Sequence, residues 1–162
     1  MTYFNDKEKV MQYIQMAEGI DGKDLDILKK HYKAYGSDNS KAFLDVYKEN
    51  NEDSQVLLLD AVTIDTDKKF DCIYTNKVLQ HLTKQELNES ILRQHDVLNN
   101  KGLLFHTFWR GDSEEMYDGL RFVYYEKDEL MNAFKGSFKI VDINYYTEED
   151  DNDSIYIILQ KE

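Results

Sequence analysis

Hydrophobic residues recur with helical spacing in the first part of the chain. Residues 6–17 place Val10 on one face together with other apolar side chains three and four positions away. Residues 23–32 repeat this spacing, with Leu28 on the apolar side. The pattern therefore predicts a helical N-terminal segment over residues 1–32.

Beyond residue 33, apolar runs of strand length alternate with amphipathic helices. Ser40 is a predicted helix N-cap, and Thr83 with Glu86 has the spacing of a capping box. Asn99–Gly102 is a predicted turn. The expected strands are residues 34–38, 55–61 (buried), 70–76, 103–109, 138–146 and 154–161, and the expected helices are residues 41–50, 84–98 and 127–134.

Alternation of strands and helices favours a mostly parallel, twisted sheet with helices on both faces. The last two expected strands are joined only by the short polar segment TEEDDND, so they must be antiparallel. We therefore expect one α/β domain over residues 1–162, with the α/β core in residues 33–162 and a β-hairpin at its C-terminus.

Composition narrows the possible functions. The formal net charge is −12, which disfavours nucleic acids and anionic membranes as partners. No apolar run approaches the roughly 20 residues that span a bilayer, and the charged start does not resemble a secretory signal, so we expect a cytoplasmic protein. Cys72 is the single cysteine and the four histidines are scattered, so no metal site is expected.

Several segments resemble the class I S-adenosylmethionine-dependent methyltransferases of the small-molecule type. These segments are GSDNSKAFLD, LLLDAVTID, FDCIYTNKVLQHLTKQE, LNNKGLLFHTFWRGD and the closing hairpin. The resemblance covers residues 33–162 and implies a Rossmann-like methyltransferase fold. It also implies in-line transfer of a methyl group from S-adenosylmethionine to a small molecule, with S-adenosylhomocysteine as product.

The resemblance implies that the cofactor-binding residues follow the carboxyl ends of the strands. Asp38 would accept hydrogen bonds from the ribose hydroxyls, and Asp60 would contact the adenine amino group. Both acids also fit a purely structural role, Asp38 as part of a turn and cap and Asp60 as a solvated strand end. The implied set is Gly22, Asp38, Asn39, Asp60, Ala61, Thr75, Asn76 and Val78.

Two histidines are the candidate bases for an oxygen or nitrogen nucleophile. His81 has the better location, on the loop that the family turns toward its substrate, and His106 comes second. Each also fits a packed structural role. Aromatic side chains can line a substrate pocket or face a cationic sulfonium, and the candidates for this role are Tyr3, Trp109, Tyr124 and Tyr125.

One departure from the family concerns its glycine-rich turn, G-x-G-x-G, after the first strand. Counting back from Asp38, Gly22 occupies the third glycine position, but Ile20 and Glu18 occupy the other two. Either YIQMA is a poor first strand followed by a degenerate loop, or residues 6–18 are a leading helix and the first strand is missing. Helical spacing favours the second interpretation.

A missing central strand would leave unpaired strand edges, which invite pairing with another chain. We therefore expect a homo-oligomer, with exchanged elements as one route to it. The same departure keeps a second function open, a catalytically inactive and oligomeric methyltransferase-fold protein with weak or no cofactor binding.

Overall fold

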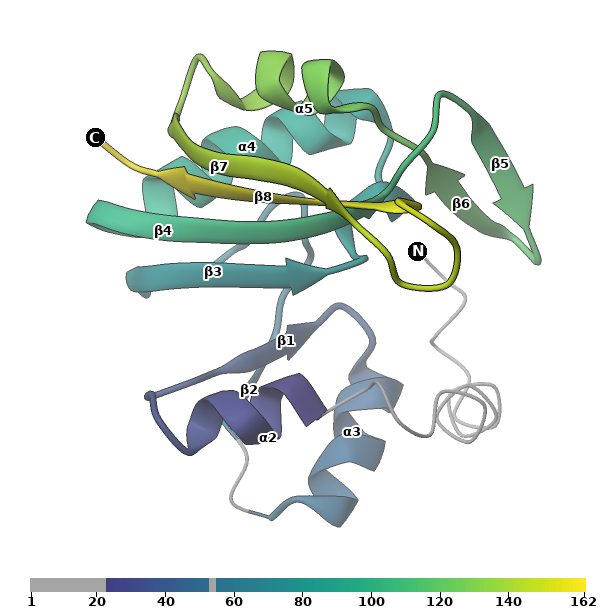
Figure 1. Cartoon of the computed structure of the whole chain (residues 1–162). Helices are drawn as coiled ribbons and strands as arrows, with labels where there is room; N and C mark the ends of the chain where they lie inside the picture. Colours follow the sequence, from purple (N-terminus) through teal and green to yellow (C-terminus); the bar gives the residue numbers. More distant parts are fainter. Residues whose placement is uncertain (1–22, 53–54) are drawn as a thin grey trace. The chain divides into compact units, whose positions relative to one another are not determined.

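The computed structural model describes residues 23–52 and 55–162, which fall into two compact units (Figure 1). The units are Met1–Ala61 and Val62–Glu162. The predicted leading helix and both interpretations of the first strand lie outside the described residues.

The described residues of the first unit form two helices and two short parallel strands. The expected N-cap is confirmed, because Ser40 Oγ accepts the Phe43 N–H at 3.1 Å. Gly36 pairs with Val56, and the ladder runs for three residues on each strand. The elements are α2 (Lys23–Lys29), β1 (Gly36–Asp38), α3 (Lys41–Asn50) and β2 (Val56–Leu58).

The strand expected over residues 55–61 is present, but it is shorter than predicted and the prediction that it is buried was wrong. β2 extends only from Val56 to Leu58, and Leu58 is 58% exposed. A strand in a two-stranded sheet has few neighbours, so an apolar composition alone does not bury it. Among the residues of this unit that the structure describes, the buried apolar ones are Leu44 and Val46, both on α3.

The second unit is built on a four-stranded mixed sheet in the order β3-β4-β8-β7. β3 and β4 are parallel, whereas β8 is antiparallel to both of its neighbours. The antiparallel closing hairpin is thus confirmed. The strands are β3 (Phe70–Asn76), β4 (Leu98–Trp109), β7 (Lys139–Tyr146) and β8 (Ser154–Gln160).

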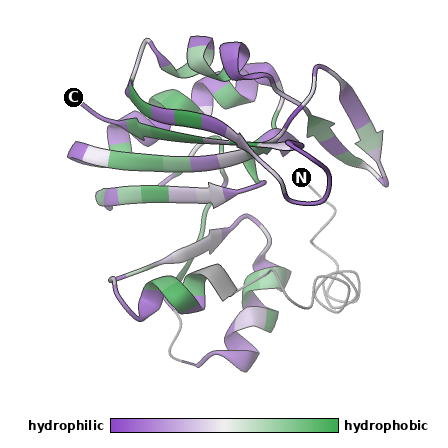
Figure 2. Ribbon diagram, in the orientation of Figure 1, coloured by the Kyte–Doolittle hydropathy of each residue, from purple (hydrophilic) through white to green (hydrophobic). Residues whose placement is uncertain are grey.

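Helices α4 (Lys84–Val97) and α5 (Lys127–Phe134) lie on one face of this sheet (Figure 1). The predicted capping box starts α4, because Thr83 Oγ1 accepts the Glu86 N–H at 3.1 Å and the Glu86 carboxylate accepts the Thr83 N–H at 2.7 Å. Figure 2 shows hydrophobic residues along β4 and β8. The fully buried core between sheet and helices includes Leu104, Phe108, Leu130, Phe134, Ile155, Ile157 and Leu159.

β4 begins earlier than expected. It starts at Leu98, immediately after α4, and includes Asn99–Gly102, where we had predicted a turn. The backbone does depart from regular strand geometry here, since Lys101 has a φ of +65°. The register against β3 also breaks between Phe70 and Cys72. The departure from regular strand geometry therefore lies inside β4 and not before it.

A second β-hairpin was not predicted. It consists of β5 (Glu114–Tyr117) and β6 (Leu120–Val123), and β6 contacts the short 3₁₀ helix η2 (Leu79–His81). Asp118 and Gly119 form its turn with φ values of +48° and +80°. Two consecutive positive φ values are what a type I′ turn needs, and Asp-Gly is a preferred pair for it.

The acidic loop between β7 and β8 is organised around one carboxylate. Asp153 accepts the backbone N–H groups of Glu148, Glu149 and Asp150 at 3.0, 2.9 and 2.9 Å. These bonds hold the loop in one conformation at the end of the hairpin. They therefore also fix the position of Glu148.

Candidate functional site

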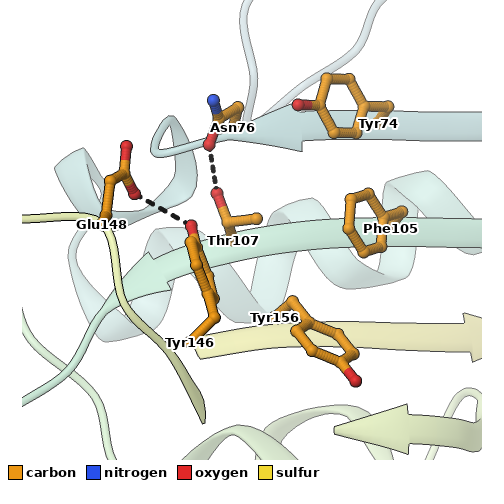
Figure 3. A pocket seen from close by; sticks show the side chains of 7 residues that line it. All are labelled: Tyr74, Asn76, Phe105, Thr107, Tyr146, Glu148 and Tyr156. Atoms are coloured by element: carbon orange, nitrogen blue, oxygen red, sulfur yellow. Dashed lines mark hydrogen bonds between the residues drawn. The ribbon is translucent and has the colours of Figure 1, made fainter. Parts of the chain in front are cut away.

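A shallow cavity of about 430 Å³ lies over the four-stranded sheet (Figure 3). Side chains alternate along a strand, so His106 and Phe108, which are buried toward the helices, place Phe105 and Thr107 on the opposite face. We call this cavity the aromatic pocket. Its lining residues are Tyr74, Asn76, Phe105, Thr107, Tyr146, Glu148 and Tyr156.

Aromatic rings from all four strands form the floor of the aromatic pocket. Tyr74 and Phe105 are partners in the β3–β4 ladder, and their rings are nearly parallel, with centroids 5.5 Å apart and an interplanar angle of 9°. Tyr156 lies 6.1 Å from Phe105, and Tyr146 lies 6.4 Å from Tyr156. The floor is therefore a continuous apolar surface made of flat side chains.

Asn76 and Thr107 form a polar end at the carboxyl ends of β3 and β4. Thr107 donates its hydroxyl to Asn76 Oδ1 at 2.5 Å and accepts the Lys77 N–H at 3.0 Å. These bonds fix the orientation of the Asn76 amide, whose nitrogen points away from Thr107 (Figure 3). The two N–H donors of Asn76 Nδ2 have no hydrogen-bond partner among the residues that the structure describes.

The Lys77 side chain connects the end of β3 to β4 and to the β7–β8 hairpin. This side chain is only 12% exposed, and Nζ donates to Ser154 Oγ at 2.7 Å and to the carbonyl oxygen of Phe108 at 3.2 Å. The ammonium also lies 3.3 Å from the centroid of the Trp109 ring. Burial lowers the pKa of Lys77, and the attraction of Glu148 opposes that shift.

Glu148 closes the pocket on the hairpin side. It forms an ion pair with Lys77 at 3.2 Å and accepts the hydroxyl of Tyr146 at 3.0 Å. Burial raises the pKa of Tyr146 to about 12, so this phenol stays protonated and keeps donating. The polar rim therefore carries one positive and one negative charge in direct contact.

Of the two candidate bases, His81 is the one that keeps a ring nitrogen without a hydrogen-bond partner among the described residues. Its Nδ1 lies 2.7 Å from the carbonyl oxygen of Arg121, which can only accept, so Nδ1 carries the proton and Nε2 holds a lone pair. The ring also packs edge-on against Phe122, with centroids 4.7 Å apart. Burial lowers the pKa of His81, which keeps the imidazole neutral. Val78, just before η2, is 43% exposed.

The geometry does not support His106 as a base. It is 0% exposed, and both ring nitrogens are used, by Thr75 Oγ1 and by Gln94 Oε1, each at 2.8 Å. Burial lowers the pKa of His106 to about 3. Because Thr75 hydrogen-bonds to the buried His106, its side chain lies on the helix-covered face of the sheet. Thr75 and Asn76 therefore lie on opposite faces of β3. His106 is a neutral core residue.

The aromatic candidates of the sequence do not gather in the aromatic pocket. One face of Trp109 is occupied by the Lys77 ammonium, and Tyr124 is half-buried beside Gly111. Tyr125 is 3% exposed and packs on Phe108; its hydroxyl has no partner among the described residues. Burial raises the pKa of Tyr125 to about 12. Tyr3 and Gly22 lie outside the described residues.

The first unit holds the two candidate acids at one edge of its sheet. Asp38 ends β1 and is half-buried, and its Oδ1 accepts the Ser40 N–H at 2.7 Å. Asp60 comes two residues after β2, whose Leu58 is the ladder partner of Asp38. Asn39 and Ala61 follow the two acids and are also half-buried. Because β1 and β2 are parallel, both acids follow carboxyl ends of strands.

The pocket residues other than Asn76 were missed in the sequence, although a signal for them was present. Tyr74 and Asn76 alternate in FDCIYTN, and Phe105 and Thr107 alternate in LLFHTFW, so each pair belongs to one face of its strand. The sequence does not show which face of the four-stranded sheet is covered by α4 and α5 of the second unit. Within residues 23–52 and 55–162, no group of three His, Cys, Asp or Glu side chains could hold a metal ion. No helix in that part of the chain is long and apolar enough to cross a membrane.

The fold defines an α/β protein with a mixed sheet and an antiparallel closing hairpin. A family model described as a methyltransferase domain matches residues 16–106, more than half of the 162 residues. The chain belongs to this methyltransferase domain family. No curated protein matches the chain in sequence.

Solved structures show the same fold at low sequence identity. An N-methyltransferase NodS from Bradyrhizobium japonicum, in complex with S-adenosylhomocysteine, has a TM-score of 0.68 at 15% identity, over 86% of this chain and 72% of its own. A SAM-dependent methyltransferase from Methanosarcina mazei has a TM-score of 0.73 at 14% identity, over 86% of this chain and 87% of its own. The glycopeptide N-methyltransferase MtfA with S-adenosylhomocysteine has a TM-score of 0.72 at 8% identity, over 99% and 91%. The expected Rossmann-like methyltransferase fold is confirmed.

Proposed function

We propose that this chain is an S-adenosylmethionine-dependent methyltransferase acting on a small molecule. The observation that carries the proposal is the family match over residues 16–106. Two of the similar structures hold S-adenosylhomocysteine, the product that such a reaction leaves. When bound, the cofactor would supply an electrophilic methyl group, and the chain's own residues would supply position and exclusion of water.

The described residues fit such a cofactor chemically. Asp38 and Asp60 are carboxylates at the carboxyl ends of paired parallel strands, and carboxylates accept hydrogen bonds from hydroxyl and amino groups. In the second unit, Asn76 offers two N–H donors at the end of β3, and one of them is enough for a contact with the cofactor. Asn39, Ala61 and Val78 remain candidates by position in the chain. Gly22 remains a candidate from the family resemblance alone.

His81 would act as general base where the acceptor atom carries a proton. The Arg121 carbonyl holds the Nδ1–H tautomer, which leaves Nε2 as the basic atom. The lowered pKa keeps that atom unprotonated at neutral pH. A neutral, oriented imidazole is the state that general-base catalysis needs.

Titration calorimetry with S-adenosylmethionine and S-adenosylhomocysteine tests the proposal. Asp38→Asn keeps an oxygen for the Ser40 N–H but removes the charge, and we expect roughly 10- to 100-fold weaker binding because hydrogen bonds to the charged group are lost. Asp112→Asn changes an exposed acid in a loop and serves as the matched control. No binding at millimolar ligand by folded protein would instead favour the inactive, oligomeric alternative.

We also propose a homo-oligomer. Among the described residues, β3 lies at one edge of the four-stranded sheet and pairs only with β4. A strand that is hydrogen-bonded on one side offers its other side to a further strand. Light scattering at micromolar concentration tests this, and a strictly monomeric species would refute it.

A further inference from the structure

We propose that the aromatic pocket binds a flat heteroaromatic molecule with a hydrogen-bond acceptor on its edge, and that this molecule is the methyl acceptor. The second part of the inference rests on the function proposed above. The first part rests on the pocket alone. Shape, unused donors and charge each limit what the pocket can take.

The shape of the pocket suits a planar ring system. Its volume of about 430 Å³ falls in the range of roughly 300–1,000 Å³ that is typical of small-molecule sites. The Tyr74 and Phe105 rings lie almost in parallel planes, and Tyr156 continues the surface on the next strand. Flat π-systems pack on such a surface with more contact than branched aliphatic groups of equal size.

A hydrogen-bond donor of the aromatic pocket that no described residue uses would bind an acceptor on the ligand. Thr107 both donates to Asn76 and accepts from Lys77, and the Tyr146 hydroxyl is taken by Glu148. The Tyr156 hydroxyl donates to Asp142. The Asn76 amide nitrogen donates to no described residue, so it is a donor that a ligand can use. A carbonyl oxygen or a ring nitrogen at the ligand's edge would satisfy it.

The charges exclude an anionic ligand. Lys77 is paired with Glu148, so the positive charge at the rim is already neutralised. The remaining field comes from a chain with a net charge of −12. A neutral or cationic heteroaromatic fits these conditions, whereas a carboxylate or phosphate would be repelled.

Caffeine is a suitable probe, because it is flat, neutral and rich in acceptors, and its ring nitrogens carry no proton to exchange for a methyl group. Its binding to the full chain can be followed by heteronuclear NMR. We expect a dissociation constant on the order of 1 mM, with shifts at the Asn76 side-chain amide and the Tyr74 and Tyr156 rings. N,N′-dimethylurea carries the acceptor without the ring, and at equal concentration it should leave the ring signals unchanged.

Three variants locate the binding. Phe105→Leu keeps an apolar side chain but removes a ring from the floor, and Asn76→Asp keeps the acceptor for Thr107 but removes both donors. Each should weaken caffeine binding roughly fivefold. Tyr117→Leu removes a ring that is 75% exposed at the tip of the β5–β6 hairpin, and it should leave the affinity within about twofold.

The inference is overturned if caffeine shifts none of the pocket signals, or if Phe105→Leu and Asn76→Asp, with native-like spectra, bind it as well as the parent chain. S-adenosylhomocysteine is titrated in the same samples. Binding of caffeine without binding of S-adenosylhomocysteine would support the pocket and refute the methyl-transfer function. The reverse result would refute the pocket and leave the function standing.

Discussion

Replacing Lys77 by methionine should destabilise the second unit clearly more than the loss of an exposed charge does. Methionine has a similar length and apolar stem, so packing on Trp109 is largely retained while the ammonium is removed. The ammonium is lost from contacts with Phe108, Ser154 and Glu148. These contacts join the end of β3 to β4 and to the β7–β8 hairpin.

The expected cost is about 2–3 kcal/mol. A hydrogen bond from a charged donor contributes about 1.5–3 kcal/mol, and the desolvation that burial imposes on a side chain only 12% exposed offsets part of the sum. The groups that lose the ammonium still have other partners. Glu148 is 32% exposed and can be hydrated, and the Ser154 hydroxyl still donates to Asp153 at 2.9 Å. The net loss therefore stays below that of a fully buried ion pair.

Urea denaturation followed by tryptophan fluorescence measures this loss. Trp109 is the single tryptophan, so its emission reports on the second unit alone. With a slope of about 1–2 kcal/mol per molar urea, the midpoint should fall by roughly 1–3 M. Lys84→Met is the control, because its ion pair with Glu129 is exposed, at 62% and 41%, and should contribute less than about 1 kcal/mol. Equal midpoint shifts for the two variants would refute the reasoning.

Three further outcomes are expected. Acid should destabilise the fold through His106, since its pKa is about 3 when folded and 6.5 when exposed, so the unfolded chain binds the proton first. Stability should then fall by about 1.4 kcal/mol per pH unit as the pH drops below 6.5, and His106→Asn should flatten that slope in pH-dependent urea titrations. Gly119→Ala should cost about 1 kcal/mol by thermal unfolding, because φ is +80° and no atom lies near enough to clash; an unchanged midpoint would contradict the assigned turn. In an assay of methyl transfer to a protonated acceptor, His81→Gln should lower kcat by roughly 10²–10⁴, and the parent's acidic limb should lie below pH 6.5; an unaffected kcat would remove His81 from the mechanism.

Local signals in the sequence were the reliable ones. The Thr83 capping box, the Ser40 cap and the bounds of β3 were confirmed, because each depends on residues adjacent in the chain. The β5–β6 hairpin was missed although Asp118-Gly119 is a strong turn signal, because the flanking segments EEMY and LRFV do not alternate clearly. Burial of β2 was overestimated because apolar composition does not reveal how many neighbours a strand has.

The candidate site was harder to predict, for a physical reason. Asn76 could be placed from the end of its strand, but the aromatic floor needs the strand order β3-β4-β8-β7, which brings Tyr156 beside Phe105 across about fifty residues of chain. The histidines show the same limit. His106 looked like a possible base until the ladder placed it under α4, where Gln94 meets it.

The alternation along β4 also limits how this protein can change over evolution. His106 is committed to the core and Phe105 to the aromatic pocket, and they are neighbours in sequence. Inserting or deleting one residue upstream in the strand would exchange the faces of these two side chains. The imidazole would then lie in the pocket, and the phenyl ring would lie beside Gln94 and Thr75, which hydrogen-bond to the imidazole in the present fold. Substitutions at Phe105 or Thr107, by contrast, leave the packing under the helices untouched. New ligand preferences can therefore arise here through point replacements, whereas changes in strand length would be eliminated.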